Sequence, residues 1–407
     1  MVLLVAVGLV WAYWCLCALY LLVLAVGAAV CRRRPRRLVG SERRFALLVP
    51  AHDEALLIGE VVEGLRRLDY PGDLRAVIVI ADNCSDATAT AAREHGAEVL
   101  ERTDPARRGK GFALEWAIGR VLADARRFDA VVVLDADSEL SAGFLRTMDA
   151  ALTEGHGAVQ ARYDVLNVHE SWRTRLMACA LALAHHVKPL GRQRLGLADG
   201  LKGNGMCFAR EVLERVPWSG ESVTEDIEYT LRLAEAGIRV EYAPDAEVRA
   251  QMPTTARQAS TQRQRWEGGR YALMGRAARL LVRGVRGRDA LLADRAADLL
   301  VPPFAEFLAV PCALIVLGAA LALSGIDASG GRVLAAAWGA VLAAAVMYLV
   351  VGLFVARVPA AVAWALAAAP VYAVWKLATC AALLARGGTG GWRRTERRAF
   401  REGGPGR

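Results

Sequence analysis

Acidic residues stand where three predicted strands end, and their spacing suits phosphate-bearing substrates. The residues at these ends are His52, Asp53 and Glu54, then Asp82, and then Asp135 and Asp137. Two carboxylates at positions i and i+2 can face one point where the chain turns, and hard divalent cations bind carboxylate oxygens together with phosphate oxygens. Aspartate is also common in plain turns. Three acidic strand ends in one unit nevertheless favour a nucleotide and metal site.

The elements that must position these residues alternate between strand and helix. Apolar, strand-like runs at 45–50, 76–81, 98–100 and 130–134 alternate with helical patterns at 54–68, 87–95 and 111–126. Such alternation indicates a mostly parallel sheet with helices on both faces. Ligands of these sheets bind at the carboxyl ends of the strands, which is where the acidic residues lie. We therefore predict an α/β domain over residues 41–253.

Composition and missing motifs exclude several classes of protein. The chain is 55% hydrophobic and 23% charged, which excludes a disordered chain and is unusual for a soluble enzyme. Neither a P-loop nor a G-x-G-x-x-G fingerprint follows the first strand, and the eight cysteines lack zinc-site spacing. The net charge is +9, but the basic residues cluster beside apolar segments. We therefore expect no nucleic-acid partner.

Apolar runs at both ends of the chain predict membrane segments. Residues 1–31 carry no charged side chain and are followed by the arginine cluster 32–37, which predicts a spanning helix with the cluster in the cytoplasm. The uncharged runs 307–326 and 333–356 predict a helical hairpin. The run 358–385 contains Pro370 and Lys376, so we favour a re-entrant or interfacial segment there. This predicts C-terminal membrane segments over 299–386 and a basic cytoplasmic tail over 387–407.

Residues 254–298 have a different pattern from the membrane runs. Arginines interleave with alanine, leucine and methionine over 254–285, which predicts amphipathic helices on the inner membrane surface. The protein is thus expected to be a multi-pass protein of the cell membrane with its catalytic domain in the cytoplasm.

Three further motifs make the pattern recognisable. Gly203-Asn204-Gly205, Thr224-Glu225-Asp226 and Gln262-Arg263-Gln264-Arg265-Trp266 follow the acidic strand ends. In this order, the motifs resemble those of the family 2 inverting glycosyltransferases of GT-A fold, over roughly residues 45–270. The resemblance is to the membrane-embedded branch, which includes cellulose, chitin, hyaluronan and poly-N-acetylglucosamine synthases and ceramide glucosyltransferases.

The resemblance implies a role for each motif residue. Pro50, Ala51, His52 and Glu54 would line the donor pocket, Asp82 would accept from the base, and Lys110 would lie near the diphosphate or ribose. Asp135 would hold the nucleotide and metal, and Asp137 would bind Mg²⁺ or Mn²⁺ directly. Asp226, with Glu225 beside it, would be the general base. Gly203 and Asn204 would approach the acceptor sugar, while Gln262, Arg263, Arg265 and Trp266 would close over the diphosphate and flank the acceptor.

Simple chemistry is consistent with these roles. A departing nucleoside diphosphate needs a divalent cation and arginine donors, and the acceptor hydroxyl needs a positioned base. One carboxylate base without a protein nucleophile implies a single displacement with inversion. Taken one by one, Asp226 could merely favour a helix N-terminus, and Trp266 could pack at the bilayer surface. His185 and His186 are expected to be packing residues.

The motifs leave the acceptor open. We favour transfer from a UDP-sugar to a growing polysaccharide, for which an accessory export protein is a conceivable partner. The alternative is transfer of one sugar to a lipid acceptor, and a remote alternative is a non-enzymatic membrane scaffold. Membrane lipid is a partner in every case.

Overall fold

A mixed sheet of eight strands forms the centre of the protein. The computed structural model describes residues 2–30 and 42–372. The strands are β1 (Phe45–Ala51), β2 (Arg75–Asp82), β3 (Glu98–Arg102), β4 (Ala130–Val133), β5 (Ser138–Leu140), β6 (Ala158–Val165), β7 (Met206–Ala209) and β8 (Val240–Ala250). Their order in the sheet is β3-β2-β1-β4-β7-β6-β8-β5.

Helices cover both faces of this sheet, as the sequence predicts. The first ones are α2 (Ile58–Arg66), α3 (Thr88–Glu94), α4 (Lys110–Leu122) and α5 (Phe144–Thr153). Alternate residues of β1 enter different cores: Phe45 and Leu47 pack into one, and Leu48 packs into the other. Since successive side chains of a strand point to opposite faces, an unbroken apolar run is what a doubly covered strand requires.

The sheet is mostly parallel, as predicted, but its second half mixes the parallel pair β6–β8 with antiparallel pairs. Strands β1 to β4 pair in parallel, but β7 runs antiparallel to both β4 and β6, and β5 runs antiparallel to β8. Along the chain, β6 and β7 are connected by α6 (Trp172–Leu181), the π-helical turn η2 (Ala182–Val187) and α7 (Lys188–Arg194), and β7 and β8 by α8 (Arg210–Arg215) and α9 (Glu225–Glu235). The carboxyl end of β4 therefore meets the amino end of β7, which brings the 203–205 turn beside Asp135.

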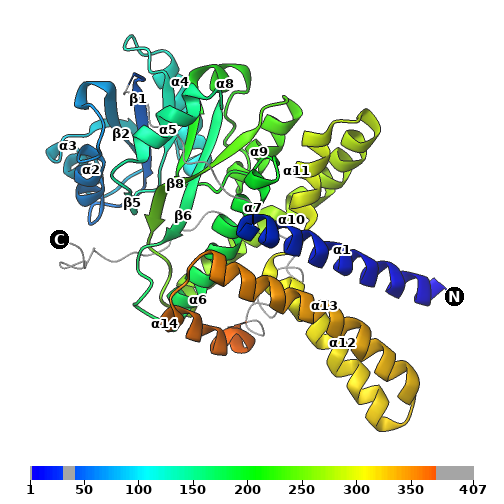
Figure 1. Ribbon diagram of the computed structural model, residues 1–407. Helices are drawn as coiled ribbons and strands as arrows, with labels where there is room; N and C mark the ends of the chain where they lie inside the picture. The colour runs from blue at the N-terminus through cyan, green and yellow to red at the C-terminus, as the bar shows by residue number, and fades with distance from the viewer. Residues whose placement is uncertain (1, 31–41, 373–407) are drawn as a thin grey trace.

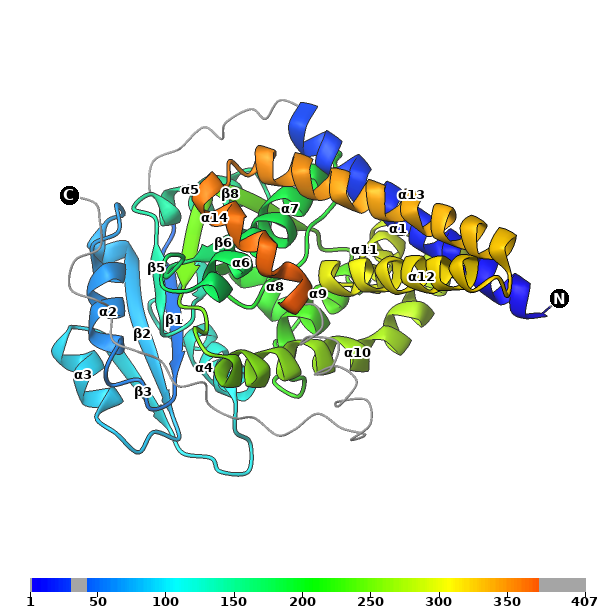
Figure 2. The ribbon, with the colours of Figure 1, turned by 90° about the horizontal axis from the view of Figure 1, so that it is seen from below.

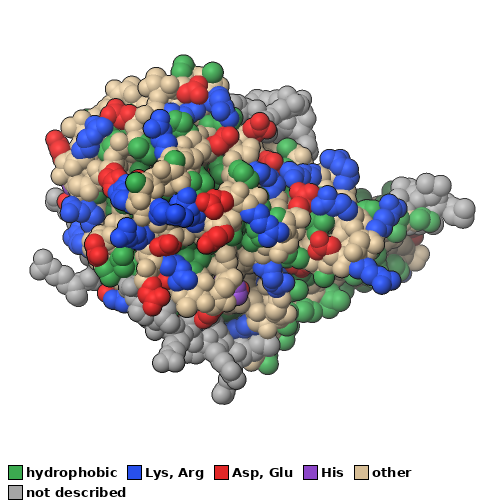
Figure 3. Space-filling view, turned by 90° about the horizontal axis from the view of Figure 1, so that it is seen from above, with side chains coloured by type: hydrophobic (Ala, Val, Ile, Leu, Met, Phe, Trp, Pro, Cys, Tyr) green, Lys and Arg blue, Asp and Glu red, His purple; other side chains and the backbone are tan. Residues whose placement is uncertain are grey.

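Three long apolar helices project from the α/β domain (Figures 1 and 2). They are α1 (Val2–Val30), α12 (Phe304–Ser324) and α13 (Ala328–Val355), and each contains a stretch long and apolar enough to cross a membrane. Large hydrophobic side chains such as Leu323 and Phe354 are exposed on them. On the face seen in Figure 3, basic and acidic side chains are interspersed over the α/β domain, and hydrophobic ones gather on the projecting part.

The predicted N-terminal helix and helical hairpin thus form as helices. The third apolar run begins as α14 (Ala360–Ala363) and the short helix η3 (Trp364–Ala368), within an apolar helical stretch that reaches Tyr372. The arginine cluster 32–37, Lys376 and the tail 387–407 lie outside the described residues.

Residues 254–298 form the predicted helices, α10 (Ala256–Gly287) and α11 (Ala290–Leu300). Part of the apolar surface of α10 packs within the protein, while Val282 and Val285 remain exposed. Leu280 packs with Leu292 of α11 and Leu231 of α9 in a separate core. Arg276 and Arg283 of α10 form ion pairs with Glu235 of α9 at 2.7 and 2.8 Å. Part of the amphipathic pattern therefore reflects packing against the catalytic domain, and the contact of α10 with the membrane surface stays a prediction.

A close backbone contact joins α1 to the catalytic domain. Gly191 of α7 lies against Leu24 of α1, and a Cβ added at Gly191 would stand only 2.1 Å from the Leu24 carbonyl oxygen. A side chain at position 191 would therefore push the two helices apart.

We expect Gly191→Ala to destabilise the protein by about 1–3 kcal/mol, because overpacking a tight contact forces the backbone to move. The measurement is the apparent Tm of the detergent-solubilised protein. Gly119→Ala in α4 is the matched control, because nothing lies within 4 Å of its added Cβ. We expect the control to leave Tm unchanged or slightly raised. Equal Tm values for the two variants would contradict the tight α1–α7 contact.

Candidate active site

A cavity of about 740 Å³ lies where the carboxyl ends of β1, β2 and β4 meet α9 and α10. It is lined by nearly all the residues predicted from the motifs: Pro50, Ala51, His52, Glu54, Asp82, Lys110, Asp135, Asp137, Gly203, Glu225, Asp226, Gln262, Arg263, Arg265 and Trp266. Residues that are more than 200 positions apart in the chain thus face the same space.

Lys110 is the electrostatic centre of this cavity. It begins α4, and its Nζ donates to Asp135 Oδ1 and to the Gly203 carbonyl oxygen, both at 2.5 Å. Burial by itself would lower the pKa of Lys110, but the Asp135 and Glu225 carboxylates outweigh burial and keep that pKa above its usual value. The lysine therefore stays charged and ties the end of β4 to the turn before β7.

Asn204 is the one predicted binding residue that the structure places behind the cavity wall. It is fully buried. Its Oδ1 accepts from the Asp135 backbone N–H at 3.2 Å, and its Nδ2 donates to Ser138 Oγ at 2.8 Å. The prediction that Asn204 contacts the acceptor is therefore corrected, because both ends of its amide are used within the protein. Asn204 holds the loop that carries Asp135 and Asp137.

Glu225 and Asp226 stand at the start of α9 and line the cavity. Burial raises the pKa of Glu225 to about 7, with a further rise from Asp226 and an opposing effect of Lys110. Burial also raises the pKa of Asp226, against the lowering effects of the Ile227 N–H and of Lys110. A carboxylate with a raised pKa is a stronger base when it is unprotonated.

Gly203 leaves space beside the Asp226 carboxylate. Its φ is +79°, a conformation that glycine adopts without strain. An added Cβ would stand 3.4 Å from Asp226 Oδ2, so any larger residue would fill the space beside the carboxylate. The predicted close approach of a ligand at this turn remains compatible with the geometry.

Asp82, which lines the cavity, is held by a buried residue that the motifs did not reveal. Arg102, at the end of β3, donates from Nη1 to Asp82 Oδ1 at 2.5 Å, and both side chains are buried. His52 Nδ1 lies 2.8 Å from the Asp82 carbonyl oxygen. Parallel pairing sets Asp82 directly opposite Arg102, and this register was the only signal that could have pointed to the arginine.

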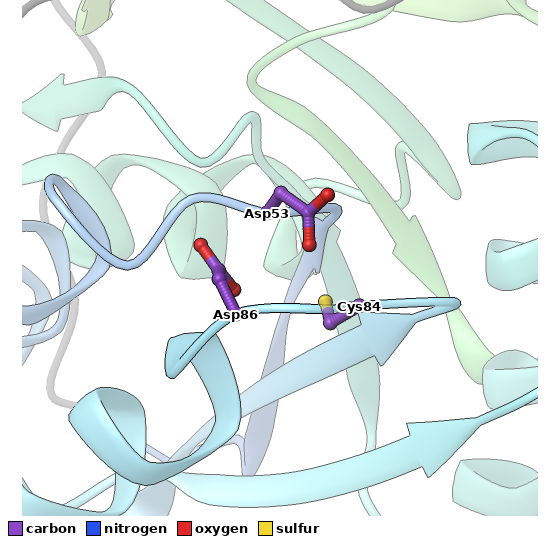
Figure 4. A group of neighbouring side chains, drawn as sticks. All are labelled: Asp53, Cys84 and Asp86. Carbon is purple, nitrogen blue, oxygen red and sulfur yellow. The ribbon is translucent and has the colours of Figure 1, made fainter.

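Two aspartates and a cysteine near Asp82 form a second polar group, which stabilises the loops after β1 and β2. Asp53, Cys84 and Asp86 face one another after β1 and β2 (Figure 4). Asp53 Oδ1 accepts from the Ser85 N–H at 2.6 Å, and Asp86 Oδ1 accepts from the Thr88 N–H at 2.9 Å. The Asp53–Ser85 bond joins the two loops, as does the Ala55 N–H, which donates to Asp86 Oδ2 at 3.2 Å, whereas the Asp86–Thr88 bond lies within the second loop. We therefore interpret the group as turn structure rather than as a metal site.

The Gln262–Trp266 motif lies near the start of α10 and forms one wall of the cavity. Arg263 donates from Nη2 to the Tyr372 hydroxyl, and its guanidinium lies 5.5 Å from the centre of the Tyr372 ring. Arg263 also lies 3.6 Å from Glu267 one turn further along the helix. The end of the short C-terminal helical stretch therefore contacts the arginine motif.

The projecting helices contribute apolar side chains to another part of the cavity lining. Its lining there includes Leu21 of α1, Phe304 and Leu308 of α12, Tyr348 and Leu349 of α13, and Leu366 of η3. One continuous cavity thus extends from the carboxylates to helices that are long and apolar enough to cross a membrane.

Fold and sequence comparisons agree on the class and the family. The α/β domain has the GT-A fold of glycosyltransferases. A solved structure, the mannosyltransferase PcManGT from Pyrobaculum calidifontis in complex with GDP-Man and Mn²⁺, is similar with a TM-score of 0.52 and 21% identity over 86% of this chain and 99% of that one. The model of the glycosyltransferase-like family 2 matches residues 43–269, and the chain belongs to this family.

Relatives in the family act on different acceptors. The beta-monoglucosyldiacylglycerol synthase of Synechocystis sp. is 31% identical over 273 residues, which is 64% of this chain and 56% of the synthase. Glucomannan 4-beta-mannosyltransferase 1 of Oryza sativa is 23% identical over 276 residues, which is 62% of this chain and 53% of that enzyme. The aligned region is thus just over half the length of either relative.

The Glu225–Asp226 pair predicts a shifted pH profile. A base acts only when unprotonated, so turnover is full above its pKa and falls as the pH drops through it. Because burial raises both pKa values, we expect the acid limb of kcat/KM well above the ordinary carboxylate range near pH 4. Replacing Glu225 by Gln removes a neighbouring negative charge and should move that limb to lower pH.

The measurement is kcat/KM against pH for the wild type and for Glu225→Gln. Glu228→Gln, one turn further along α9, is the control and should leave the limb in place. A wild-type limb near pH 4, or no shift in Glu225→Gln, would contradict the interpretation of the pair.

Proposed function

We propose that this protein transfers a single sugar from a UDP-sugar to the hydroxyl of a membrane lipid. The observation that carries the proposal is the continuous cavity, which has carboxylates at one end and side chains of α1, α12 and α13 at the other. A water-soluble donor suits the first end, and an acyl-chain acceptor suits the second. The similarity to a beta-monoglucosyldiacylglycerol synthase supports a lipid acceptor.

The chemistry follows from the residues in the cavity. Asp226 takes the proton from the lipid hydroxyl as its oxygen attacks the anomeric carbon, and the bond from that carbon to the diphosphate oxygen breaks. Lys110 and Arg265 balance the negative charge that grows on the leaving diphosphate. A single displacement inverts the anomeric centre, so an α-linked donor gives a β-linked glycolipid.

Asp135 and Asp137 fit a divalent cation. Both carboxylates line the cavity, and Asn204 fixes the loop that carries them. Carboxylate oxygens beside a diphosphate are the ligands that Mg²⁺ and Mn²⁺ prefer. A bound cation would stabilise the charge of the diphosphate.

The lipid acceptor has more support than a growing polysaccharide, which is the acceptor that the sequence motifs favoured. Glucomannan mannosyltransferases also resemble this chain, but with lower identity, 23% against 31%. The apolar lining from Leu21, Leu308 and Tyr348 suits acyl chains better than a hydroxyl-rich sugar chain. Placing α1, α12 and α13 across the cell membrane would set the catalytic domain on its cytoplasmic side, where nucleotide sugars occur.

The experiment uses the full-length protein in phospholipid vesicles with a panel of UDP-sugars, Mg²⁺ or Mn²⁺, and dioleoylglycerol. We expect UDP release that depends on the added lipid, together with a lipid that carries one sugar in mass spectrometry. Asp226→Asn should lower turnover by about 10²–10⁴-fold, because a positioned base contributes roughly that factor. Donor binding should persist in this variant.

Asp245→Asn is the control, because Asp245 lies on β8 and does not line the cavity; it should keep wild-type turnover. Long sugar chains as the product, or lipid-independent turnover that Asp226→Asn retains, would contradict the proposal.

A further inference from the structure

A second polar group lines the cavity beyond Asp226, between α7 and α11. Lys188 Nζ lies 2.6 Å from Asp298 Oδ1, and Arg295 Nη2 lies 3.4 Å from Asp298 Oδ2. All three residues line the cavity. None of them belongs to the motifs of the nucleotide site, so their presence in the cavity needs its own explanation.

The group carries more positive than negative charge. Arg192 lies behind it with no exposed surface, pairs with Asp294, and donates from Nε to the Ala198 carbonyl oxygen at 2.8 Å. The cations Lys188, Arg192 and Arg295 thus face two carboxylates, those of Asp294 and Asp298. The group therefore has one net positive charge, which a polar oxygen atom of a bound ligand can offset.

Arg295 is the group that can receive such an oxygen. Its side chain is 3% exposed, and its Nη2 makes no hydrogen bond among the described residues, although it lies in an ion pair 3.4 Å from Asp298 Oδ2. A buried donor left without a partner is costly. Gly200 lies close beside it, because an added Cβ there would stand 3.4 Å from Arg295 Nη1. Arg295 itself lines the cavity.

His185 adds a second unused polar atom. Its Nδ1 is buried without a hydrogen-bond partner in the described part of the chain, and its ring stacks on Tyr163 with 5.5 Å between the ring centres. Burial and the nearby Lys202 lower the pKa of His185 to about 3, so the ring is neutral. It lies on η2, a π-helical turn, and such turns are frequent at functional sites. His186 next to it bonds the Tyr242 hydroxyl at 2.8 Å, which fits a packing role.

Arg295 of α11 and Asp226 of α9 are linked through two shared neighbours, Gly200 and Thr230. Thr230 donates from Oγ1 to the Asp226 carbonyl oxygen at 2.8 Å, and the methyl carbon of Thr230 would lie 3.5 Å from an added Cβ at Gly200, where Arg295 also approaches. In a diacylglycerol, an ester carbonyl lies only a few bonds from the free hydroxyl. A lipid with its hydroxyl at Asp226 would therefore place an ester carbonyl in the same cavity that Arg295 lines.

We propose that Arg295, assisted by His185, binds an ester carbonyl oxygen of the acceptor lipid and thereby sets the lipid hydroxyl against Asp226. This inference rests on the proposed function. It names the acceptor class as lipids with an ester next to the hydroxyl. Arg295 is a binding residue in this scheme, and no bond to it forms or breaks.

The test compares dioleoylglycerol with its dialkyl ether analogue, which keeps the hydroxyl and the chains but lacks the carbonyl oxygens. Both are presented to the full-length protein in identical vesicles. We expect wild-type kcat/KM to favour the ester by about 10–100-fold, the range of a hydrogen bond to a charged group. Arg295→Gln should lose most of this factor with the ester and little with the ether. Arg283→Gln on α10, which is exposed, is the control and should keep the preference.

Each outcome of this test supports or contradicts the proposed carbonyl site. Equal wild-type kcat/KM values with the ester lipid and the ether lipid would contradict the carbonyl site but not lipid glycosylation. This result needs no variant. Equal losses with both lipids in Arg295→Gln would assign Arg295 a purely structural role. If Arg295→Gln does not fold, His185→Phe takes its place and should narrow the ester preference. Stronger competition by phosphatidic acid than by dioleoylglycerol would indicate an anion site instead. A complete lack of glycolipid product would refute the proposed function itself.

Discussion

Charge compensation by Lys110 is the interaction on which the site depends. Asp135 and Asp137 after β4, and Glu225 and Asp226 at the start of α9, all line one cavity, and like charges so placed repel. The Lys110 ammonium bonds Asp135 and the turn at Gly203, and it also acts on both carboxylates of α9. The same lysine therefore joins three separate segments and lowers the pKa values of the two α9 carboxylates against the effect of burial.

A second set of charges ties this site to the membrane helices. Tyr20 of α1 donates to Asp298 of α11 at 2.6 Å, and Arg192 of α7 donates to Tyr20. With Gly191 packed against Leu24, the first apolar helix is held directly on the catalytic domain. Burying charge is costly unless it is paired, so this network fixes the position of α1. The cavity can then run without a break from the carboxylates to apolar side chains, and a soluble donor can meet a lipid acceptor.

Much of the fold and most of the candidate site could be predicted from the sequence, and the failures have physical reasons. Apolar runs bounded by turns located β1, β2 and β4 closely, because strands covered on both faces must be apolar throughout. The antiparallel β7 was not predicted, since Met206–Ala209 has the same apolar pattern in either direction. Asn204 was assigned to the acceptor because it lies within a motif, but its burial shows that it holds the loop.

The contact of Arg102 with Asp82, and the roles proposed for Arg295 and His185, were not predicted for a different reason. Their environment comes from pairing and packing across the fold, which neighbouring residues in the sequence do not reveal. The amphipathic pattern of α10 was likewise ambiguous, because a helix packed on protein and a helix lying on lipid show the same periodicity.

The central claim is that the acceptor lipid enters the same cavity as the carboxylates of the proposed donor site. Its most direct test is photocrosslinking with a diacylglycerol that carries a photoreactive group in an acyl chain, followed by mapping of the labelled peptides. We expect UDP-dependent labelling of the segments around Leu308, Tyr348 and Leu366, which line the cavity. Labelling confined to outward residues such as Leu323 and Phe354, unchanged by UDP, would contradict the claim.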